Sequence, residues 1–456
     1  MPWSAEELAG GQIQCECGRV HHVPIHTIRS GEDVLEHLPE DVAHLGLPRR
    51  AIIVADETTY DLAGRKVVEL LEADQITTEE VILRPRRAFG QRHWVLPDEH
   101  SLGQVLLAIG DEPCFLVAVG AGTINDIVRF VAHRTGKAFI SVGTAPSMDG
   151  YASTVSALLT GSFKKTVPAT YPAAIYIDAQ LLATAPLEMV AAGFGDLVGK
   201  SVAMADWMLS HILNGEYYCP TIHSIVEQVL QMALIDVMAL RQREPEALVR
   251  LTEGLVLSGL AILMFNDSRP VSGAEHELAH FWEIRGIPEG KLFYHGAKVA
   301  VATPIITKFY SELLAKDPNR IDWEQVGANR PSLEQYSRQL EQDFQGAWQS
   351  IATAAWRESK AVEFARASGE LLSDHWVEIQ RRVPASLLDI ERIMADLRTL
   401  EAPATPRELG LEREWVEASL RSAREMKPHR YTVMDLAAEM GCLDEISEAV
   451  LTWIWP

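Results

Sequence analysis

The sequence has few cysteines, little positive charge and no long hydrophobic run. Its five cysteines form an odd, sparse set in 456 residues, which favours a reducing cytoplasm over a disulfide-stapled secreted domain. The longest apolar stretch, residues 254–265, is too short to cross a membrane and predicts a buried helix. Residues 1–11 lack the basic segment and apolar run of a signal peptide. We therefore expect a cytoplasmic protein without a membrane span.

The charge balance excludes some ligands and constrains others. The net charge of −22 argues against a nucleic-acid partner, which would require a basic face. An anionic small molecule would also meet a repulsive average field, so a phosphate site needs local basic groups. The length suggests two or three domains with ample core.

Short apolar runs alternate with helical patterns in the first part of the chain. Continuous apolar runs of this length predict buried parallel strands, here at residues 51–55, 78–83, 115–119, 138–142 and 173–177. Helical spacing lies between them, at residues 59–72, 101–109 and 124–133. This alternation predicts βαβ units and a Rossmann-like parallel sheet. The first forty residues show no such pattern, and we expect them to be irregular.

The strand signals stop after about residue 186. The remaining sequence is almost entirely helical in pattern, and we expect prolines such as Pro220, Pro270 and Pro304 to interrupt the helices. The chain is therefore predicted to contain an α/β domain over residues 1–185 and an all-helical domain over residues 186–456. The cleft between two such domains is the default position of an active site.

Three strand ends in the α/β part carry the residues of a nucleotide site. Glycines at a strand-to-helix turn let the backbone approach a pyrophosphate, as in Gly120, Ala121, Gly122, Thr123, Ile124, Asn125 and Asp126. The next strand is followed by Thr144, Ala145, Pro146 and Ser147. Asp56 ends the first strong strand, where an acid commonly holds the ribose hydroxyls of a dinucleotide. An ordinary helix-capping role for Asp56 remains the alternative.

The helical part carries a candidate metal site. Asp196 lies near a predicted helix start, His276 and His280 share a helix face at i, i+4, and His295 opens a later helix. A carboxylate and two or three imidazoles suit Zn²⁺, Ni²⁺ or Fe²⁺ with a position left open for substrate. The alternative is a capping acid and histidines in a polar interface.

The segment His276-Glu277-Leu-Ala-His280 also matches H-E-x-x-H, the zinc-protease signature, in which Glu277 would be the general base. That hypothesis leaves the nucleotide-like half of the chain unexplained.

Two basic residues near these positions are candidates for binding a phosphate. Lys200 lies one turn after Asp196, with an ion pair to Asp196 as the alternative. Arg269 precedes the histidine helix, with a loop-pinning role as the alternative.

The cluster Cys15, Cys17, His21 and His22 has only two thiols, fewer ligands than a structural zinc site needs, so we expect a plain surface loop.

These residues together have a family resemblance. Several ordered motifs closely resemble sn-glycerol-1-phosphate dehydrogenases, which group with glycerol dehydrogenases, iron-type alcohol dehydrogenases and dehydroquinate synthases. The motifs are Gly-Ala-Gly-Thr-Ile-Asn-Asp at 120–126, Thr-Ala-Pro-Ser-Met-Asp-Gly-Tyr-Ala-Ser at 144–153, Gly-Phe-Gly-Asp at 193–196, Ser-Arg-Pro-Val-Ser-Gly-Ala-Glu-His at 268–276 and His-Gly-Ala-Lys at 295–298. The resemblance covers residues 50–310, with a weaker echo at residues 430–437.

The resemblance implies a role for each matching position. Asp196, His276 and His295 would bind a divalent zinc, nickel or iron ion, and His280 would contact the substrate or relay a proton. Asp149 would contact the substrate. NAD(H) or NADP(H) would bind at Gly122 to Asp126, Thr144 to Ser147 and Ser153, with Asp56 at the adenosine ribose. The implied activity is the reversible reduction of dihydroxyacetone phosphate to sn-glycerol 1-phosphate in glycerophospholipid-related metabolism, by a protein that we expect to be a homo-oligomer.

Four alternatives stay open. A relative in the same group would act on an unphosphorylated polyol or ketone, and a dehydroquinate synthase-like lyase would use NAD without net redox change. The zinc protease would cleave peptides without a nucleotide. A degenerate binding module would keep the fold without a metal, against which the intact Asp196, His276 and His295 argue.

Overall fold

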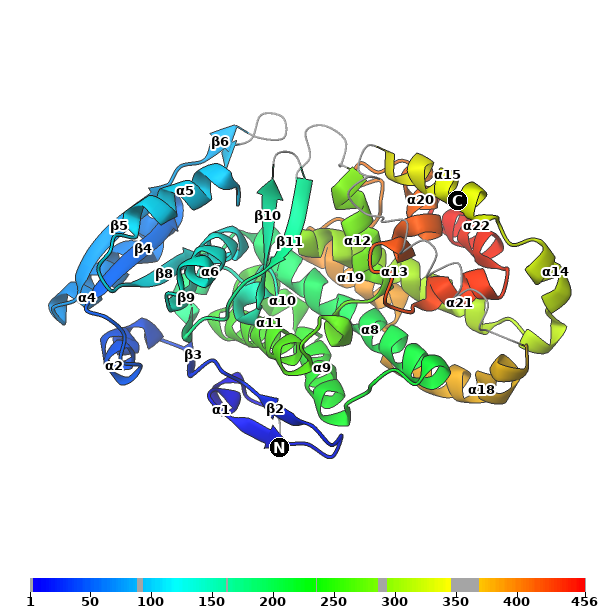
Figure 1. Cartoon of the computed structure of the whole chain (residues 1–456), viewed down its shortest axis with the longest axis horizontal. Coiled ribbons are helices and arrows are strands. Elements are labelled where there is room, and N and C mark those ends of the chain that lie inside the picture. The colour runs from blue at the N-terminus through cyan, green and yellow to red at the C-terminus, as the bar shows by residue number, and fades with distance from the viewer. Residues whose placement is uncertain are drawn as a thin grey trace. The chain divides into compact units, whose positions relative to one another are not determined.

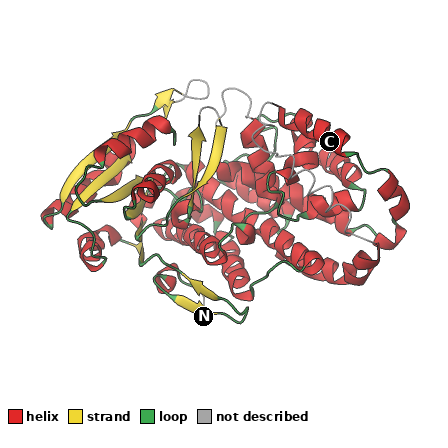
Figure 2. Cartoon of the chain, viewed as in Figure 1, coloured by secondary structure: helices red, strands yellow, loops and turns green. Residues whose placement is uncertain are grey.

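The computed structural model describes residues 3–87, 93–160, 163–234, 236–285, 293–345 and 369–455. The chain separates into two compact units by its internal contacts (Figure 1). The first unit comprises Met1–Leu197, Ser224–Asp267 and Thr399–Ala402, and the second comprises Val198–His223, Ser268–Arg398 and Pro403–Pro456. All strands in the described residues belong to the first unit, and the second is helical there (Figure 2).

Six parallel strands form the central sheet of the first unit. Their spatial order is β3 (Thr27–Gly31), β12 (Ala174–Asp178), β9 (Phe139–Gly143), β8 (Phe115–Gly120), β4 (Arg50–Asp56) and β5 (Thr77–Leu83). Each neighbouring pair is parallel. The predicted α/β class with a parallel sheet is confirmed.

Helices cover both faces of this sheet because its strands are apolar on both sides. Alternate residues of β4 belong to different cores: Ile53 packs with Val67 on one face, and Ile52 packs with Val128 on the other. The helices on the Ile53 face are α2 (Leu38–His44) and α4 (Arg65–Ala73), and those on the Ile52 face are α5 (Glu99–Ala108) and α6 (Gly122–Thr135).

The five predicted strands correspond to β4, β5, β8, β9 and β12. The predicted helices at residues 101–109 and 124–133 correspond to α5 and α6. The helical pattern at residues 59–72 begins earlier than expected, with α3 (Glu57–Thr59) and a π-helical turn, Tyr60–Gly64, before α4.

The expectation that the first forty residues are irregular is wrong. They contain α1 (Ala5–Leu8), the hairpin strands β1 (Gln12–Gln14) and β2 (Val20–His22), and β3 at the edge of the sheet. Within β3 only Ile28 is a large apolar residue, so the strand depends on pairing with β12 and not on its own apolar pattern. The antiparallel hairpin β10 (Val155–Thr160) and β11 (Phe163–Pro168) also has no counterpart among the predicted strands.

The helices of the first unit include α10 (Val237–Gln242) and α11 (Pro245–Phe265), and the predicted buried stretch at residues 254–265 lies within α11. By length and composition alone, helix α11 is long and apolar enough to cross a membrane. However, 67% of its most apolar window is buried inside the protein, as in the core helix of a globular unit.

The second unit packs around one large apolar cluster that includes Trp282, Phe309, Phe344 and Leu436. Helices that contribute to it are α12 (Ala274–Arg285), α13 (His295–Leu314), α15 (Leu333–Phe344), α18 (Gly369–Arg382), α20 (Arg413–Ser422), α21 (Val433–Glu439) and α22 (Leu443–Ile454). The expected interruption at Pro304 is wrong, because α13 continues through it. Its neighbours Ile305 and Ile306 are buried, so tertiary packing offsets the hydrogen bond that proline cannot donate.

Candidate nucleotide and metal sites

The carboxyl edge of the parallel sheet brings the predicted nucleotide residues together. Strands β9, β8 and β4 are neighbours and end at Gly143, Gly120 and Asp56. Because parallel strands end at one edge, the segments that follow them line the same side of the first unit. Helix α6 begins at Gly122 and so presents its first backbone N–H groups at that edge.

Tight packing explains the two glycines of this turn. A Cβ atom at Gly120 would lie 2.5 Å from Cγ1 of Ile124, and one at Gly122 would lie 3.3 Å from Cγ of Met148. The buried Asn125 fixes the turn, since its Nδ2 donates to the Gly120 carbonyl oxygen at 3.1 Å and its Oδ1 accepts from Ser141 Oγ at 2.6 Å. Asn125 therefore fixes the backbone of the turn, for which pyrophosphate binding stays a prediction.

Arg129 connects α6 to the segment after β9. Its buried guanidinium pairs with Asp126 at 2.9 Å and donates to the carbonyl oxygens of Gly150 and Val155. Burial lowers the pKa of Arg129, and the Asp126 carboxylate acts in the opposite direction. These bonds hold the segment that carries Ser153, whose Oγ contacts the backbone of Val155.

The segment after β9 also packs on α8 (Leu187–Asn214). A Cβ atom at Gly193 would lie 1.9 Å from the carbonyl oxygen of Pro146, so only glycine permits this approach. Tyr151 closes the segment by donating its hydroxyl to the Ala145 carbonyl oxygen at 2.7 Å. Thr144 and Ser147 are both largely buried.

Asp56 has the capping role that its position left open. Its Oδ1 accepts from the backbone N–H of Thr59 at 2.8 Å, while Thr59 Oγ1 accepts from the Asp56 backbone N–H at 3.0 Å. This cap uses only one of the two carboxylate oxygens of Asp56. The residue is the last of β4, as the ribose prediction requires. Its contact with a ribose stays a prediction.

Two predicted acids are neighbours in the first unit. The backbone N–H of Asp149 donates to Oδ2 of the fully buried Asp196 at 3.0 Å. The Asp149 side chain in turn accepts from Ser258 Oγ at 2.9 Å. The segment after β9 therefore orients the carboxylate that we predicted as a metal ligand.

The three predicted histidines cluster within the second unit. The ring centroid of His295, at the start of α13, lies 5.3 Å from that of His276 and 5.1 Å from that of His280. The rings of His276 and His280 are 6.2 Å apart on α12. The sequence spacing explains the second pair, whereas the approach of His295 depends on packing between α12 and α13.

Carboxylates orient two of these rings. Nδ1 of His276 lies 2.6 Å from Oε1 of Glu275, and Nδ1 of His295 lies 2.9 Å from Oε1 of Glu283. An ionised carboxylate can only accept, so these contacts place the proton on Nδ1 and the lone pair on Nε2, the arrangement typical of metal-binding histidines. Sequence reasoning missed Glu275 and Glu283, although both lie within three residues of a candidate histidine.

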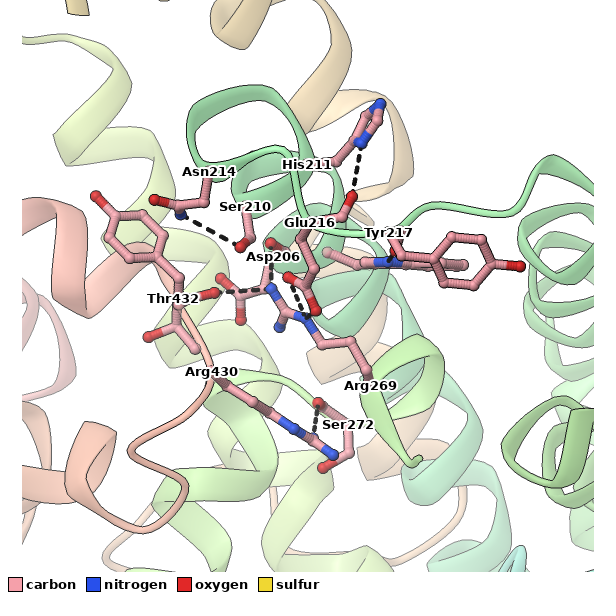
Figure 3. A network of polar contacts seen from close by, with 12 residues as sticks. Asp206, Ser210, His211, Asn214, Glu216, Tyr217, Arg269, Ser272, Arg430 and Thr432 are labelled. Atoms are coloured by element: carbon pink, nitrogen blue, oxygen red, sulfur yellow. Dashed lines mark hydrogen bonds and ion pairs between the residues drawn. The ribbon is translucent and has the colours of Figure 1, made fainter. Parts of the chain in front are cut away.

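The structure shows Arg269 in a buried polar network of the second unit (Figure 3). Its Nε donates to both carboxylate oxygens of Glu216 at 3.0 Å, and its Nη2 donates at 2.8 Å to the carbonyl oxygens of Asp206 and Tyr431. Lys200, the other predicted phosphate contact, is fully buried on α8. Both roles toward a phosphate stay predictions.

Asp206 lies at the centre of this network. Its carboxylate accepts from Tyr310 Oη at 2.5 Å, from the Val433 backbone N–H at 2.9 Å and from the Ala274 backbone N–H at 2.7 Å. Burial raises the pKa of Asp206 to about 7, against the influence of the Arg269 charge and the Tyr310 hydrogen bond. Through Ala274, Asp206 fixes the start of the helix that carries His276.

Known proteins match the chain along most of its length. A model of the iron-containing alcohol dehydrogenase family matches residues 29–186. A glycerol-1-phosphate dehydrogenase (NAD(P)+) from Geobacillus stearothermophilus is 33% identical over 442 residues, which cover 96% of this chain and 99% of that protein. The corresponding protein from Halalkalibacterium halodurans is 39% identical over 299 residues, covering 65% of this chain and 74% of that protein.

Solved structures show the same fold at low sequence identity. Glycerol dehydrogenase from Schizosaccharomyces pombe superposes with a TM-score of 0.58 at 16% identity, covering 93% of this chain and 90% of that one. The NADH-dependent butanol dehydrogenase A from Thermotoga maritima gives a TM-score of 0.56 at 15% identity, covering 92% and 96%. The sequence relatives place the chain in the glycerol-1-phosphate dehydrogenase family of oxidoreductases.

Proposed function

We propose that this protein reduces dihydroxyacetone phosphate to sn-glycerol 1-phosphate with NADH or NADPH, reversibly and with one divalent metal ion. The observation that carries the proposal is the 33% identity to a glycerol-1-phosphate dehydrogenase over 99% of that relative's length. We also propose that the protein is cytoplasmic, in keeping with its sparse cysteines. We propose further that it assembles with copies of itself.

The metal ligands in this proposal are Asp196, His276 and His295. The donor set fits a divalent transition metal, because it combines a carboxylate with imidazoles whose Nδ1 atoms face glutamates. A cation bound there supplies Lewis-acid activation of the ketone, and the nicotinamide supplies the hydride. The choice among zinc, nickel and iron is open to experiment.

The chain's own residues position the reactants and move the proton. The backbone of Gly120 and Gly122 with the N-terminus of α6 accommodates the pyrophosphate, and Asp149 contacts the substrate. His280 delivers the proton to the reduced oxygen, with Glu283 Oε2 at 3.7 Å from its Nδ1 as the neighbouring carboxylate.

Lys427 and Arg430 are further candidates for phosphate recognition. Lys427 Nζ lies 3.2 Å from Ser268 Oγ and 3.0 Å from Ser272 Oγ, and Arg430 Nη2 donates to Ser268 Oγ at 2.8 Å. Two cations and two hydroxyls therefore converge on the loop that precedes the helix of His276, all within the second unit. This is the local positive charge that a phosphate needs on a protein of net charge −22.

The phosphate assignment predicts a selective loss in the variant Lys427→Met. We expect the KM for dihydroxyacetone phosphate to rise by about 10- to 150-fold, since a charge-assisted hydrogen bond contributes about 1.5–3 kcal/mol. Turnover of unphosphorylated dihydroxyacetone should hardly change. Steady-state kinetics on both ketones test this, with Lys316→Met as the control because Lys316 pairs with Glu445 at the surface. Equal losses on both ketones would show that Lys427 is only structural.

The cofactor assignment predicts a preference for NADH that depends on Asp56. A carboxylate suits ribose hydroxyls and repels a 2′-phosphate, so Asp56→Asn should narrow the NADH-to-NADPH ratio of kcat/KM by about tenfold. Asparagine can also cap the helix, so this variant removes the charge of Asp56 and keeps the cap. Asp236→Asn, at the cap of α10, is the matched control. A strong native preference for NADPH would contradict the assignment.

The substrate proposal is tested by following NADH oxidation with dihydroxyacetone phosphate and with dihydroxyacetone. We expect the phosphorylated ketone to be the far better substrate. If the two ketones are reduced at equal efficiency, the relative acting on an unphosphorylated polyol becomes the better description.

A further inference from the structure

The N-terminal hairpin of the first unit gathers three metal-ligating side chains. In the turn between β1 and β2, the Cys15 backbone N–H donates to the Arg19 carbonyl oxygen at 3.1 Å, and the Gly18 N–H donates to the Cys15 carbonyl oxygen at 3.0 Å. Gly18 adopts a φ of 85°, which favours glycine. This tight turn carries Cys15 and Cys17, and β2 returns His21 beside them.

His21 is oriented for coordination. Its Nδ1 lies 3.2 Å from the carbonyl oxygen of Met264, and a carbonyl can only accept, so Nδ1 carries the proton. Nε2 then presents its lone pair, and it lies 3.4 Å from Sγ of Cys17. His21 is only 2% exposed, so the surface loop that we expected for this segment is wrong.

Cys219 supplies a third thiol from a distant part of the sequence. It directly precedes α9 (Pro220–Ala233), which continues unbroken into residues that bind the N-terminal segment. Trp3 donates its backbone N–H to Gln228 Oε1 at 2.6 Å and its indole N–H to Ser224 Oγ at 3.0 Å. The Ile222 N–H points to Cys219 Sγ at 3.5 Å, and a helix N-terminus stabilises a thiolate.

We propose that Cys15, Cys17, His21 and Cys219 bind a structural zinc ion. Their four ligand atoms lie within 4.8 Å of one another. A tetrahedral zinc ion with sulfur at about 2.3 Å and nitrogen at about 2.0 Å holds its ligands about 3.5–3.8 Å apart, so small movements complete the site.

The donor set makes this site structural. Three thiolates and one imidazole fill the four positions of zinc and leave none for a substrate. The ion would stabilise the N-terminal hairpin, which the short β1–β2 pairing alone holds weakly. The site shares no residue with the proposed catalytic metal site, so an experiment can disprove one of the two sites and leave the other standing.

Cobalt substitution tests the site without reference to activity. Cobalt bound to thiolates absorbs in the near ultraviolet through ligand-to-metal charge transfer, and the proposed catalytic donors contain no sulfur. We expect this absorption in the cobalt-loaded wild-type protein and in His276→Ala. We expect its loss in Cys17→Ser and in Cys219→Ser. The control Cys114→Ser, in the core beside the sheet, should retain it. Absence of the band from the wild type, or its persistence in Cys219→Ser, would overturn the proposal.

A second measurement needs no variant and so does not depend on variants folding. Treating the native wild-type protein with an organic mercurial, which captures thiolates, should release about one zinc ion per chain, detected with a chromogenic chelator. The same release from His276→Ala would separate this zinc from any catalytic metal. If the mercurial titrates the thiols of zinc-supplemented protein without releasing zinc, these side chains do not bind it.

Discussion

We expect His276→Ala to lose both its bound catalytic metal and its ketone reduction. The imidazole of His276 is held by Glu275 and lies beside those of His280 and His295, so alanine removes one of the three proposed metal ligands. We expect turnover to fall by at least about 10³-fold, because removing even one oxyanion-stabilising donor costs about 10²–10³. Metal content and turnover are measured on the same preparation.

Companion variants distinguish the dehydrogenase site from the H-E-x-x-H alternative. Asp196→Ala and His295→Ala should behave like His276→Ala, whereas His280→Ala should retain some metal and lose most turnover. Glu277→Gln should keep substantial ketone reduction, since Glu277 is not a base in this account. A metal-free His280→Ala together with a metal-loaded His295→Ala would favour the protease-type ligand set.

The second large effect that we expect is on stability, in Asp206→Ala. The variant leaves three buried donors without their acceptor, namely Tyr310 Oη and the backbone N–H groups of Ala274 and Val433. At about 1–3 kcal/mol for each unsatisfied buried donor, the free energy of unfolding should fall by at least about 3 kcal/mol. Chemical denaturation measures the loss, and Glu334→Ala, which removes an exposed pair with Arg338, should change stability by under about 0.5 kcal/mol.

The loss in Asp206→Ala should also depend on pH. Burial raises the pKa of Asp206 in the folded protein to about 7, above the value of the unfolded chain, so the folded state binds more protons between these values. The contribution of Asp206 to stability is therefore largest at acidic pH and declines as the pH rises through about 7. Asp206→Ala should be more destabilising at pH 5 than at pH 8. Equal losses at pH 5 and pH 8 would show that the folded carboxyl is already ionised at pH 5, contrary to this prediction.

Most strands of the sheet could be predicted from the sequence because the central strands have a strong apolar pattern. Strands β4 and β8 are continuous apolar runs, and both are buried on their two faces. The edge strand β3 carries no such signal, since a polar strand is stabilised by its partner β12. The β10–β11 hairpin pairs two segments of mixed polar and apolar character, which give no long apolar run to detect.

The residues of the candidate sites could be predicted from the sequence only where they lie close together along the chain. The glycine turn at Gly120 and the i, i+4 pair His276 and His280 are local patterns that the sequence displays directly. The environment of Arg269 depends on Glu216 and Tyr431, which lie far from it in sequence. Likewise, Cys219 cannot be linked to Cys15 and Cys17 until the fold brings α9 to the N-terminal segment.

The most direct test of the central claim combines NADH oxidation with the identity of the product. The purified protein, reconstituted separately with Zn²⁺, Ni²⁺ and Fe²⁺, is incubated with NADH and dihydroxyacetone phosphate, and the enantiomer of the glycerol phosphate formed is determined. We predict that at least one metal supports the reaction and that sn-glycerol 1-phosphate forms in the amount of NADH consumed. No oxidation dependent on dihydroxyacetone phosphate with any of the three metals, or formation of the opposite enantiomer, would contradict the account.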